Sequence, residues 1–379
     1  MKILSLFDGM ACGMIVMLNA GIEVESYDAY EIDKYAIQVS SHNFPNIRHH
    51  GDVFKADFTQ HEGVDFLVGG SPCTYWSIAQ KNGRETEASG MGWELFSQYV
   101  RAVKEAKPKF FIYENNKSMS AAIRESIDKA FGFEAVCINS ALVSAQNRQR
   151  LYWVGMRNKD GTYSKVPVDQ PEDKSILLRD ILESHVTEQA YELQSVGIGY
   201  RGRMEDGKWV KRYESNGEPK ANAITTAQTD SMVAEPVRVG DIGSTAQAHR
   251  VYSCDGKSVT INAGGGGQGG KTGLYLCPVL SGGENIPVYQ VKNGMIAIKG
   301  KQYPIKLEDG FYIIRKLTVT ECMRLQTVPE WYDFSVISNS QAYKCLGNGW
   351  TCDVITHLIK ATQTVARRKW LDELLGGCL

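Results

Sequence analysis

Residues 2–21 read KILSLFDGMACGMIVMLNAG and contain, in order, a strand, a turn and a helix. The apolar run 2–7 ends at Asp8-Gly9, which is typical of a buried strand, and 13–21 follows with the character of a helix. The turn therefore lies at the carboxyl end of a strand, where open α/β sheets bind ligands. Helix N-terminal amides favour a carboxylate or phosphate there. The glycines do not match GxGxxG, so the stretch does not predict a dinucleotide-binding fingerprint.

The same alternation of strand and helix continues to residue 157. The predicted strands are rich in apolar residues, and the helix at 92–107 is amphipathic. This alternation predicts an α/β fold with a parallel or mostly parallel sheet. The predicted strands are 24–32, 64–70, 109–115, 134–140 and 150–156, and the predicted helices are 33–44, 92–107 and 118–130.

Composition describes a folded chain of more than one domain. The chain has 379 residues, and at roughly 100–200 residues per domain we expect two domains. Hydrophobic residues make up 43% of it, enough for a sizeable core, so a disordered protein is excluded. The net charge of -1 gives no global basic signature, although a local basic face would suffice to bind nucleic acid.

Cysteine usage and the amino-terminal segment indicate the cellular environment. The chain contains nine scattered cysteines and no CxxC pair, so we expect reduced thiols, with neither a disulfide framework nor a metal site. The apolar stretch at the amino terminus is too short for a signal peptide, and the chain contains no run of about 18 apolar residues that could span a membrane. We therefore expect a soluble cytoplasmic protein with no membrane partner.

The second half of the chain has a different character. From about 176 to 315 helix periodicity fades and glycine rises, with a weak repeat between 220–233 and 257–276. The run NAGGGGQGG at 262–270 fits either a loop or a close approach of the backbone to a partner. The carboxyl-terminal part returns to helical patterns. The stretch 317–332 predicts a helix that stops before Pro329, and 353–375 predicts a long amphipathic helix that needs to bury its apolar stripe against the amino-terminal sheet.

Two acidic residues indicate a cofactor that carries adenosine. Glu31 ends the second predicted strand, about 20 residues after the glycine turn, where a carboxylate can accept hydrogen bonds from ribose hydroxyls. Asp52 is placed to accept from an exocyclic amine. The alternative for each is an ordinary surface or capping carboxylate.

Three further groups suggest nucleophilic chemistry. Cys73, in GGSPCTYWS, follows an apolar strand, and Glu114 ends another strand, where a carboxylate is costly unless paired or functional. Gln146, Arg148 and Arg150 alternate, so on a strand they would share a face, and fixed cations there could lower a thiol pKa. Taken singly, a buried structural thiol and a polar surface strand remain the alternatives.

Together these pieces resemble the DNA (cytosine-5) methyltransferase family, and the style of the middle segment resembles phage or prophage members. The resemblance covers residues 1–157 and 317–360, with a variable target-recognition region between them. Its motifs are FDGMACG, YEIDKYA, GDV, GGSPCTYWS, ENN, SAQNRQR, LTVTECMRLQTVP and GNG (347–349). The combination is specific, whereas no single motif is.

The resemblance implies a fold, a reaction and a set of site residues. The fold would be Rossmann-like with a mostly parallel sheet, the catalytic domain comprising 1–175 and 335–379 and an irregular, β-rich target-recognition domain comprising 176–334. Cys73 would be the nucleophile on a cytosine flipped out of duplex DNA, with Glu114, Arg148 and Arg150 as the other catalytic residues, and the protein would act as a monomer. Substrate contacts are assigned to Ser77 and Gln146. Contacts to S-adenosylmethionine are assigned to Phe7, Asp8, Gly9, Gly13, Glu31, Ile32, Asp52, Val53, Pro72 and Asn348.

Several residues depart from the family pattern. Thr74 stands where glutamine is usual, and Asn116 adds a polar group after Glu114-Asn115. Met14 and Tyr30 flank the expected cofactor pocket. Packing explains most such changes. The alternative is a changed donor preference, in which the Tyr30 hydroxyl contacts a modified sulfonium cofactor.

Other functions compete with DNA methylation. The same machinery could act on RNA cytosine, although the middle region has the size of a DNA-reading domain. A catalytically silent DNA-binding regulator would have lost Cys73 or Glu114, and both are present. A nicotinamide oxidoreductase is disfavoured by the missing GxGxxG. The glycine-bearing loop 74–92 is expected to close over a flipped base, because a duplex shields the reacting carbon.

Overall fold

The computed structural model describes residues 1–77, 83–183, 198–205, 208–215, 238–241, 250–253, 256–258, 274–278, 288–298, 300–315 and 317–376. The chain divides into two compact units. One contains Met1–Ile176 and the chain from Cys322 onward, and the other lies within Leu177–Glu321. The return to the first unit thus comes at Cys322, before the boundary at 335 that the sequence predicts.

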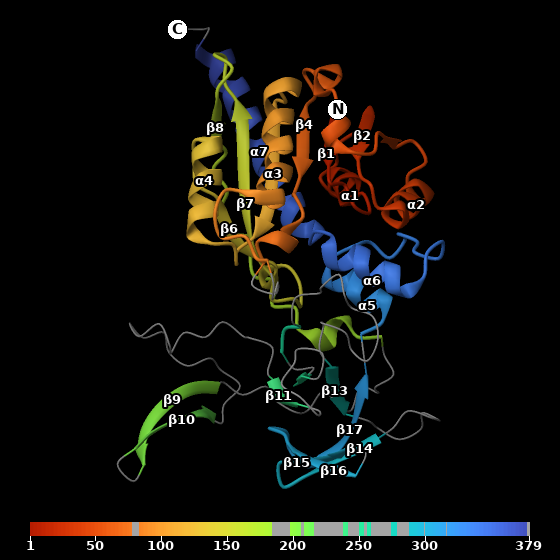
Figure 1. Cartoon of the computed structure of the whole chain (residues 1–379), viewed down its shortest axis with the longest axis vertical. Helices are drawn as coiled ribbons and strands as arrows, with labels where there is room; N and C mark the ends of the chain where they lie inside the picture. The colour runs from red at the N-terminus through yellow and green to blue at the C-terminus, as the bar shows by residue number, and fades with distance from the viewer. Residues whose placement is uncertain are drawn as a thin grey trace. The chain divides into compact units, whose positions relative to one another are not determined.

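A mostly parallel sheet forms the first unit (Figure 1), which confirms the predicted α/β class. Its order is β3-β2-β1-β4-β5-β7-β6, and β8 pairs with β7. Strands β3, β2, β1, β4 and β5 are parallel, whereas β7 is antiparallel to β5, β6 and β8. The strands are β1 Lys2–Leu6, β2 Ser26–Tyr30, β3 Arg48–His49, β4 Phe66–Gly69, β5 Phe110–Asn116, β6 Val136–Asn139, β7 Gln149–Arg157 and β8 Tyr163–Lys165.

The helices largely follow the predicted pattern. Helix α5 ends at Leu325, before Pro329 as the sequence predicts, and the chain leaves the helix where Thr327 adopts a left-handed φ of 50°. Helix α6 was not predicted. The helices are α1 Cys12–Asn19, α2 Lys34–Asn43, α3 Gly90–Ala106, α4 Ala121–Phe131, α5 Val319–Leu325, α6 Asn339–Asn348 and α7 Cys352–Gly376.

An aromatic core packs against the central strands β4 and β5. Trp76, Phe96 and Tyr99 are fully or almost fully buried in one cluster with Phe111 and Trp153. The Tyr99 hydroxyl donates to the carbonyl of Ile112, at 2.8 Å, so α3 is fixed to the sheet. Large aromatic side chains contribute most of the hydrophobic free energy of such a core. The loops that follow β4 and β5 therefore start from rigid strands.

Helix α7 covers a second surface of the first unit. Val354, Ile355, Leu358 and Ile359 are fully buried, and the helix packs against α1. The helix thus buries its apolar stripe against a helix of the amino-terminal part, α1, whereas the sequence predicted the amino-terminal sheet. In the part of the chain that the structure describes, no helix has the length and hydropathy needed to cross a membrane.

The second unit is rich in β-strands. Its larger sheet has the order β11-β12-β13-β17-β14-β15-β16 and is mostly antiparallel, and a separate antiparallel pair joins β9 to β10. A small apolar cluster includes Val251, Val291 and Ile296. The predicted segment 220–233 and glycine run 262–270 lie outside the described residues. The strands are β9 Ile198–Glu205, β10 Lys208–Ser215, β11 Arg238–Asp241, β12 Arg250–Ser253, β13 Leu274–Pro278, β14 Val288–Lys292, β15 Met295–Ile298, β16 Lys301–Pro304 and β17 Gly310–Arg315.

Candidate active site

The strand order fixes where a ligand binds. β1 lies between β2 and β4, and the order of the strands reverses there, so the loops after β1 and β4 flank the topological switch point. Two glycines allow close packing at this edge, Gly13 of α1 against β2 and Gly70 after β4 against the end of β5. A Cβ on Gly13 would lie 2.2 Å from the Tyr27 hydroxyl, and one on Gly70 would lie 2.7 Å from the carbonyl oxygen of Glu114.

The loop after β1 is held by Glu31. Three residues of this loop adopt left-handed φ values, and two of them, Phe7 at 56° and Ala11 at 61°, are not glycine. Such backbone is concentrated at ligand sites. The Gly9 amide donates to Glu31 Oε2 at 2.8 Å, while Oε1 accepts from the amide of Ile32 at 2.7 Å. Oε1 also accepts from the amide of Asp33 at 2.8 Å. Because a carboxylate has about four acceptor positions, about one remains, on Oε2, for a ligand hydroxyl.

Asp8 is buried beneath this loop. Its Oδ1 accepts from the Tyr27 hydroxyl at 2.6 Å, and its Oδ2 is a buried oxygen without a hydrogen-bond partner among the described residues. Burial raises the pKa of Asp8 to about 7, and the nearby carboxylate of Glu31 adds to this rise, although hydrogen bonds from Ser5 and Tyr27 oppose it. An unsatisfied acceptor at the switch point fits a ligand with cationic or N–H groups.

The loops after β2 and β3 offer an apolar and an acidic surface. Ile32 is 75% exposed, which is unusual for an isoleucine that directly follows a buried strand. Asp52 caps the 3₁₀ turn Val53–Lys55 by accepting from the Phe54 amide at 3.0 Å, and Val53 is buried below it. A flat base beside Ile32, with its amine toward Asp52, fits these side chains.

Tyr30 does not have the position that the changed-donor hypothesis requires. Its side chain is 4% exposed and stacks on His50, with ring centroids 5.1 Å apart. Its hydroxyl lies 3.2 Å from Nε2 of His61, so the hydroxyl is used inside the protein. Met14 is half-buried on α1. The hypothesis of a tyrosine hydroxyl that contacts a modified donor is therefore wrong.

Cys73 lies on a short 3₁₀ turn, Cys73–Tyr75, directly after β4 and Pro72. The residue is exposed. Its carbonyl accepts from the amides of Trp76 at 3.1 Å and Ser77 at 3.0 Å, and the fully buried Trp76 side chain anchors the turn in the core. An accessible thiol is thus presented from a fixed backbone. Residues 78–82 of the predicted closing loop lie outside the described residues.

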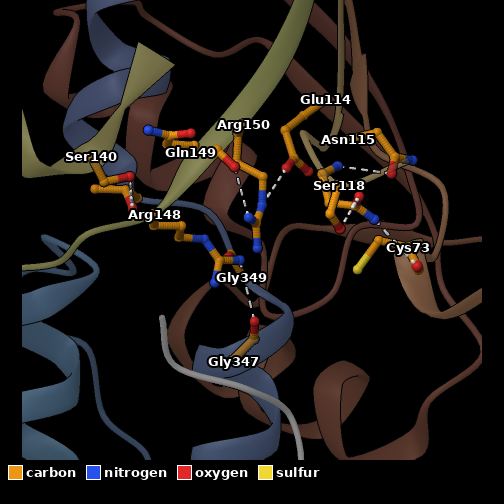
Figure 2. Close-up of polar contacts among 12 residues, drawn as sticks. Cys73, Glu114, Asn115, Ser118, Ser140, Arg148, Gln149, Arg150, Gly347 and Gly349 are labelled. Atoms are coloured by element: carbon orange, nitrogen blue, oxygen red, sulfur yellow. Dashed lines mark hydrogen bonds and ion pairs between the residues drawn. The ribbon is translucent and has the colours of Figure 1, made fainter. Parts of the chain in front are cut away.

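Glu114 forms an ion pair with Arg150. Oε1 of Glu114 lies 3.0 Å from Nε of Arg150, and the two side chains are only 13% and 14% exposed (Figure 2). The strand register explains the pair. Asn116 on β5 lies opposite Arg150 on β7, and Glu114, two residues before Asn116, is on the same face of β5 and so next to Arg150. A carboxylate and a guanidinium in so little water interact strongly. They form one polar group at the carboxyl end of β5.

Arg148 has a different environment from Arg150. It is buried, and its guanidinium donates to the carbonyls of Gly347 at 3.2 Å and Gly349 at 3.0 Å (Figure 2). Burial, together with the positive charge of Arg150, lowers the pKa of Arg148 to about 10, so it stays charged at neutral pH. The cation therefore holds the turn that carries the exposed Asn348.

Gln146, Arg148 and Arg150 do not share a strand face, which corrects the prediction. Strand β7 begins only at Gln149, so the two earlier residues belong to irregular chain. Gln146 is fully buried, and its amide donates to the carbonyl of Leu325 at 3.2 Å. Its side chain thus joins distant parts of the first unit.

One contact near the cofactor loop has no signal in the sequence. The Tyr332 hydroxyl donates to the carbonyl of Met10 at 2.6 Å and so supports the loop after β1 from the other end of the chain. Among the described residues, no group of three or more His, Cys, Asp or Glu side chains is arranged to hold a metal ion.

Comparison with known families decides the identity. The model of the C-5 cytosine-specific DNA methylase family matches residues 1–364. The chain belongs to this family. The motif-based resemblance is thereby confirmed, and DNA (cytosine-5) methyltransferase is the activity that the family and the names of its relatives indicate.

Phage and bacterial enzymes are among the relatives of this cytosine methyltransferase. The orphan methyltransferase M.SPRI of Bacillus phage SPR is 26% identical and covers 95% of this chain and 97% of its own. The type II methyltransferase M.HhaI of Haemophilus parahaemolyticus is 24% identical, with coverages of 94% and 93%.

Solved structures agree on the fold. A putative DNA modification methyltransferase from an Escherichia coli prophage superposes with a TM-score of 0.55 at 18% identity, covering 97% of this chain and 99% of its own. Dnmt2 of S. pombe gives a TM-score of 0.56 at 12% identity, with coverages of 96% and 99%. At these identities the likeness establishes the methyltransferase fold alone.

Proposed function

We propose that this methyltransferase attacks carbon 6 of a cytosine, flipped out of duplex DNA, with the thiolate of Cys73 and adds a methyl group at carbon 5. The observation that carries the proposal is the exposed thiol on a rigid turn at the switch point. The neighbouring strands β5 and β7 supply a largely buried ion pair, Glu114 with Arg150. A thiolate is the strongest nucleophile among ordinary side chains at neutral pH.

The residues divide the chemistry between them. Addition of the Cys73 thiolate forms a bond from Sγ to carbon 6, and the electron pair of the ring double bond makes carbon 5 nucleophilic. Negative charge grows on the ring, and Glu114 meets it with a proton or a hydrogen bond at N3. Arg150 holds Glu114 and stabilises the developing charge. Once carbon 5 carries the methyl group, a base removes its proton, the ring double bond re-forms, and the bond from Sγ to carbon 6 breaks, so that Cys73 leaves as a thiolate.

S-adenosylmethionine fits the cofactor side of the switch point. When bound, it supplies an electrophilic methyl group. Oε2 of Glu31 has about one acceptor position left for a ribose hydroxyl, Ile32 has an exposed apolar surface for adenine, and Asp52 lies on the next loop. The buried carboxyl of Asp8 belongs to the same loop, and a cationic ligand beside it would favour its charged form. We assign the remaining cofactor contacts to Phe7, Gly9, Gly13, Val53, Pro72 and Asn348.

Duplex DNA is the proposed substrate, since relatives that match along almost the whole chain are named as type II or phage methyltransferases. Residues 176–334 would read the target sequence, with the first-unit part of this range, from Cys322, supporting the cofactor loop. Ser77 follows the nucleophile turn and would contact the flipped nucleotide, whereas Gln146 would act by holding the Leu325 segment. We propose a monomer on DNA.

Nucleoside mass spectrometry tests the proposal. Purified protein is incubated with S-adenosylmethionine and duplex DNA of mixed sequence, beside Cys73→Ser. We expect 5-methylcytosine with the wild type and none with the variant. Parallel reactions with transfer RNA and single-stranded RNA identify an RNA substrate. Methylation of RNA but not of DNA, or an active Cys73→Ser variant, would refute the proposal.

A further inference from the structure

Asn116 has contacts that an apolar side chain at this position could not make. It ends β5, is 4% exposed, and its Nδ2 donates to the carbonyl oxygen of Cys73 at 3.3 Å. Its Oδ1 accepts from the hydroxyl of Ser118 at 2.9 Å. Because a carbonyl oxygen only accepts, the amide nitrogen has to face Cys73, and this fixes the orientation of the Asn116 side chain.

The preceding residue holds the other side of the same turn. Nδ2 of Asn115 donates to the carbonyl of Ser71 at 3.1 Å and to the hydroxyl of Tyr113 at 3.1 Å. Oδ1 of Asn115 accepts from the backbone amide of Asn116 at 2.8 Å. The side-chain amides of Asn115 and Asn116, at the end of β5, therefore contact the carbonyls of Ser71 and Cys73, on either side of Pro72.

Arg84 extends this arrangement. Its Nη2 donates to the carbonyl of Ser118 at 2.7 Å, and its Nε donates to the carbonyl of Trp76 at 3.2 Å. Arg84 thus fixes Ser118, the residue that orients Asn116. The same guanidinium also holds Trp76, which directly follows the turn Cys73–Tyr75. Connected polar contacts of this kind reduce the freedom of each member.

We propose that Asn116 is a positioning residue for the thiol of Cys73. Its amide supplies a third donor to the Cys73 carbonyl, beside the amides of Trp76 and Ser77, and so holds the backbone of the nucleophile before a base arrives. A valine at 116 supplies no donor. This role rests on the proposed function of Cys73 and concerns the rate of attack, not the binding of DNA or cofactor.

The test compares Asn116→Val and Asn116→Asp with the wild type. Aspartate keeps the shape and removes the donor, and Asn46→Asp, at an exposed position far from Cys73 in sequence, is the matched control. We expect kcat, and the rate of covalent trapping by 5-fluorocytosine DNA, to fall about three- to tenfold in both 116 variants, as loss of one hydrogen bond implies. KM for DNA and for S-adenosylmethionine stays unchanged.

Amide hydrogen exchange gives a readout that needs no activity. The amides of Trp76 and Ser77 share the carbonyl that Asn116 contacts, so their exchange should accelerate in both 116 variants and not in Asn46→Asp. Unchanged exchange, or faster exchange with unchanged kcat, overturns the proposal. If the wild type modifies no nucleic acid, the proposed function fails, while faster exchange in the 116 variants still supports the positioning of Cys73.

Discussion

The buried carboxyl of Asp8 gives the protein a specific dependence of stability on pH. Its pKa is raised from 3.8 to about 7 in the folded state, mainly by burial. The folded state therefore holds this proton more tightly than the unfolded state. Stability is highest below pH 4 with respect to this group and decreases as the pH rises through 7. The difference of about three units corresponds to about 4 kcal/mol.

Asp8→Asn removes this titration while keeping the size of the side chain. The free energy of unfolding of the variant, relative to the wild type, should rise by up to about 4 kcal/mol between pH 4 and pH 8. At pH 4 the difference should reflect packing alone, since the wild-type group is then protonated in the folded state. Ser5, Tyr27 and Glu31 are the polar neighbours that act on the carboxyl.

Urea unfolding followed by fluorescence, at pH values from 4 to 8, measures this difference. The experiment is done without cofactor, because a bound cation would favour the charged form of Asp8. Tyr27→Phe is the useful second variant, since it removes the hydroxyl that donates to Oδ1. If the difference between Asp8→Asn and the wild type is the same at pH 4 and pH 8, the burial argument is wrong.

Three further predictions concern the site. Glu114→Gln should lower kcat about 10²- to 10⁴-fold with little change in DNA affinity, because the amide cannot transfer a proton; steady-state kinetics that show less than a tenfold loss would contradict the role of Glu114. Gly70→Ala should cost about 1–3 kcal/mol in urea unfolding, since its Cβ would meet the backbone oxygen of Glu114 at 2.7 Å, and an unaltered midpoint would show that the strands can separate. Glu31→Gln should weaken S-adenosylmethionine binding about tenfold in calorimetry, and equal affinity would exclude Glu31 from the cofactor site.

The elements around the switch point were predictable because short-range patterns determine them. Three apolar runs end at the loop after β1, at Gly69 and at Glu114. Because buried parallel strands end at the same edge of a sheet, these runs alone place the three positions together, independently of the rest of the chain. The sequence could not predict the end of β2 at Tyr30, because Glu31 uses its own carboxylate to hold the next two amides.

Contacts over long separations were beyond prediction. Gln146 looked like part of an alternating strand, but its acceptor is the carbonyl of Leu325, 179 residues away. Arg148 was expected beside Arg150, and its partners are carbonyls of the Gly347–Gly349 turn. The residues next to Gln146 and Arg148 in the sequence carry no information about a carbonyl that lies about 180 to 200 residues away. The sequence therefore indicated which polar side chains matter, but it could not indicate where they point.

The first unit is closed by residues from both ends of the chain, and this has a consequence for synthesis on the ribosome. The hydroxyls of Ser140 and Thr351 form a hydrogen bond, Ser144 donates to the carbonyl of Leu325, and the Tyr332 hydroxyl donates to the carbonyl of Met10. A nascent chain that stops before residue 322 contains Cys73 and Glu114 but leaves these buried polar groups without partners. Newly made enzyme should therefore modify no DNA until the segment around α5–α7 has left the exit tunnel.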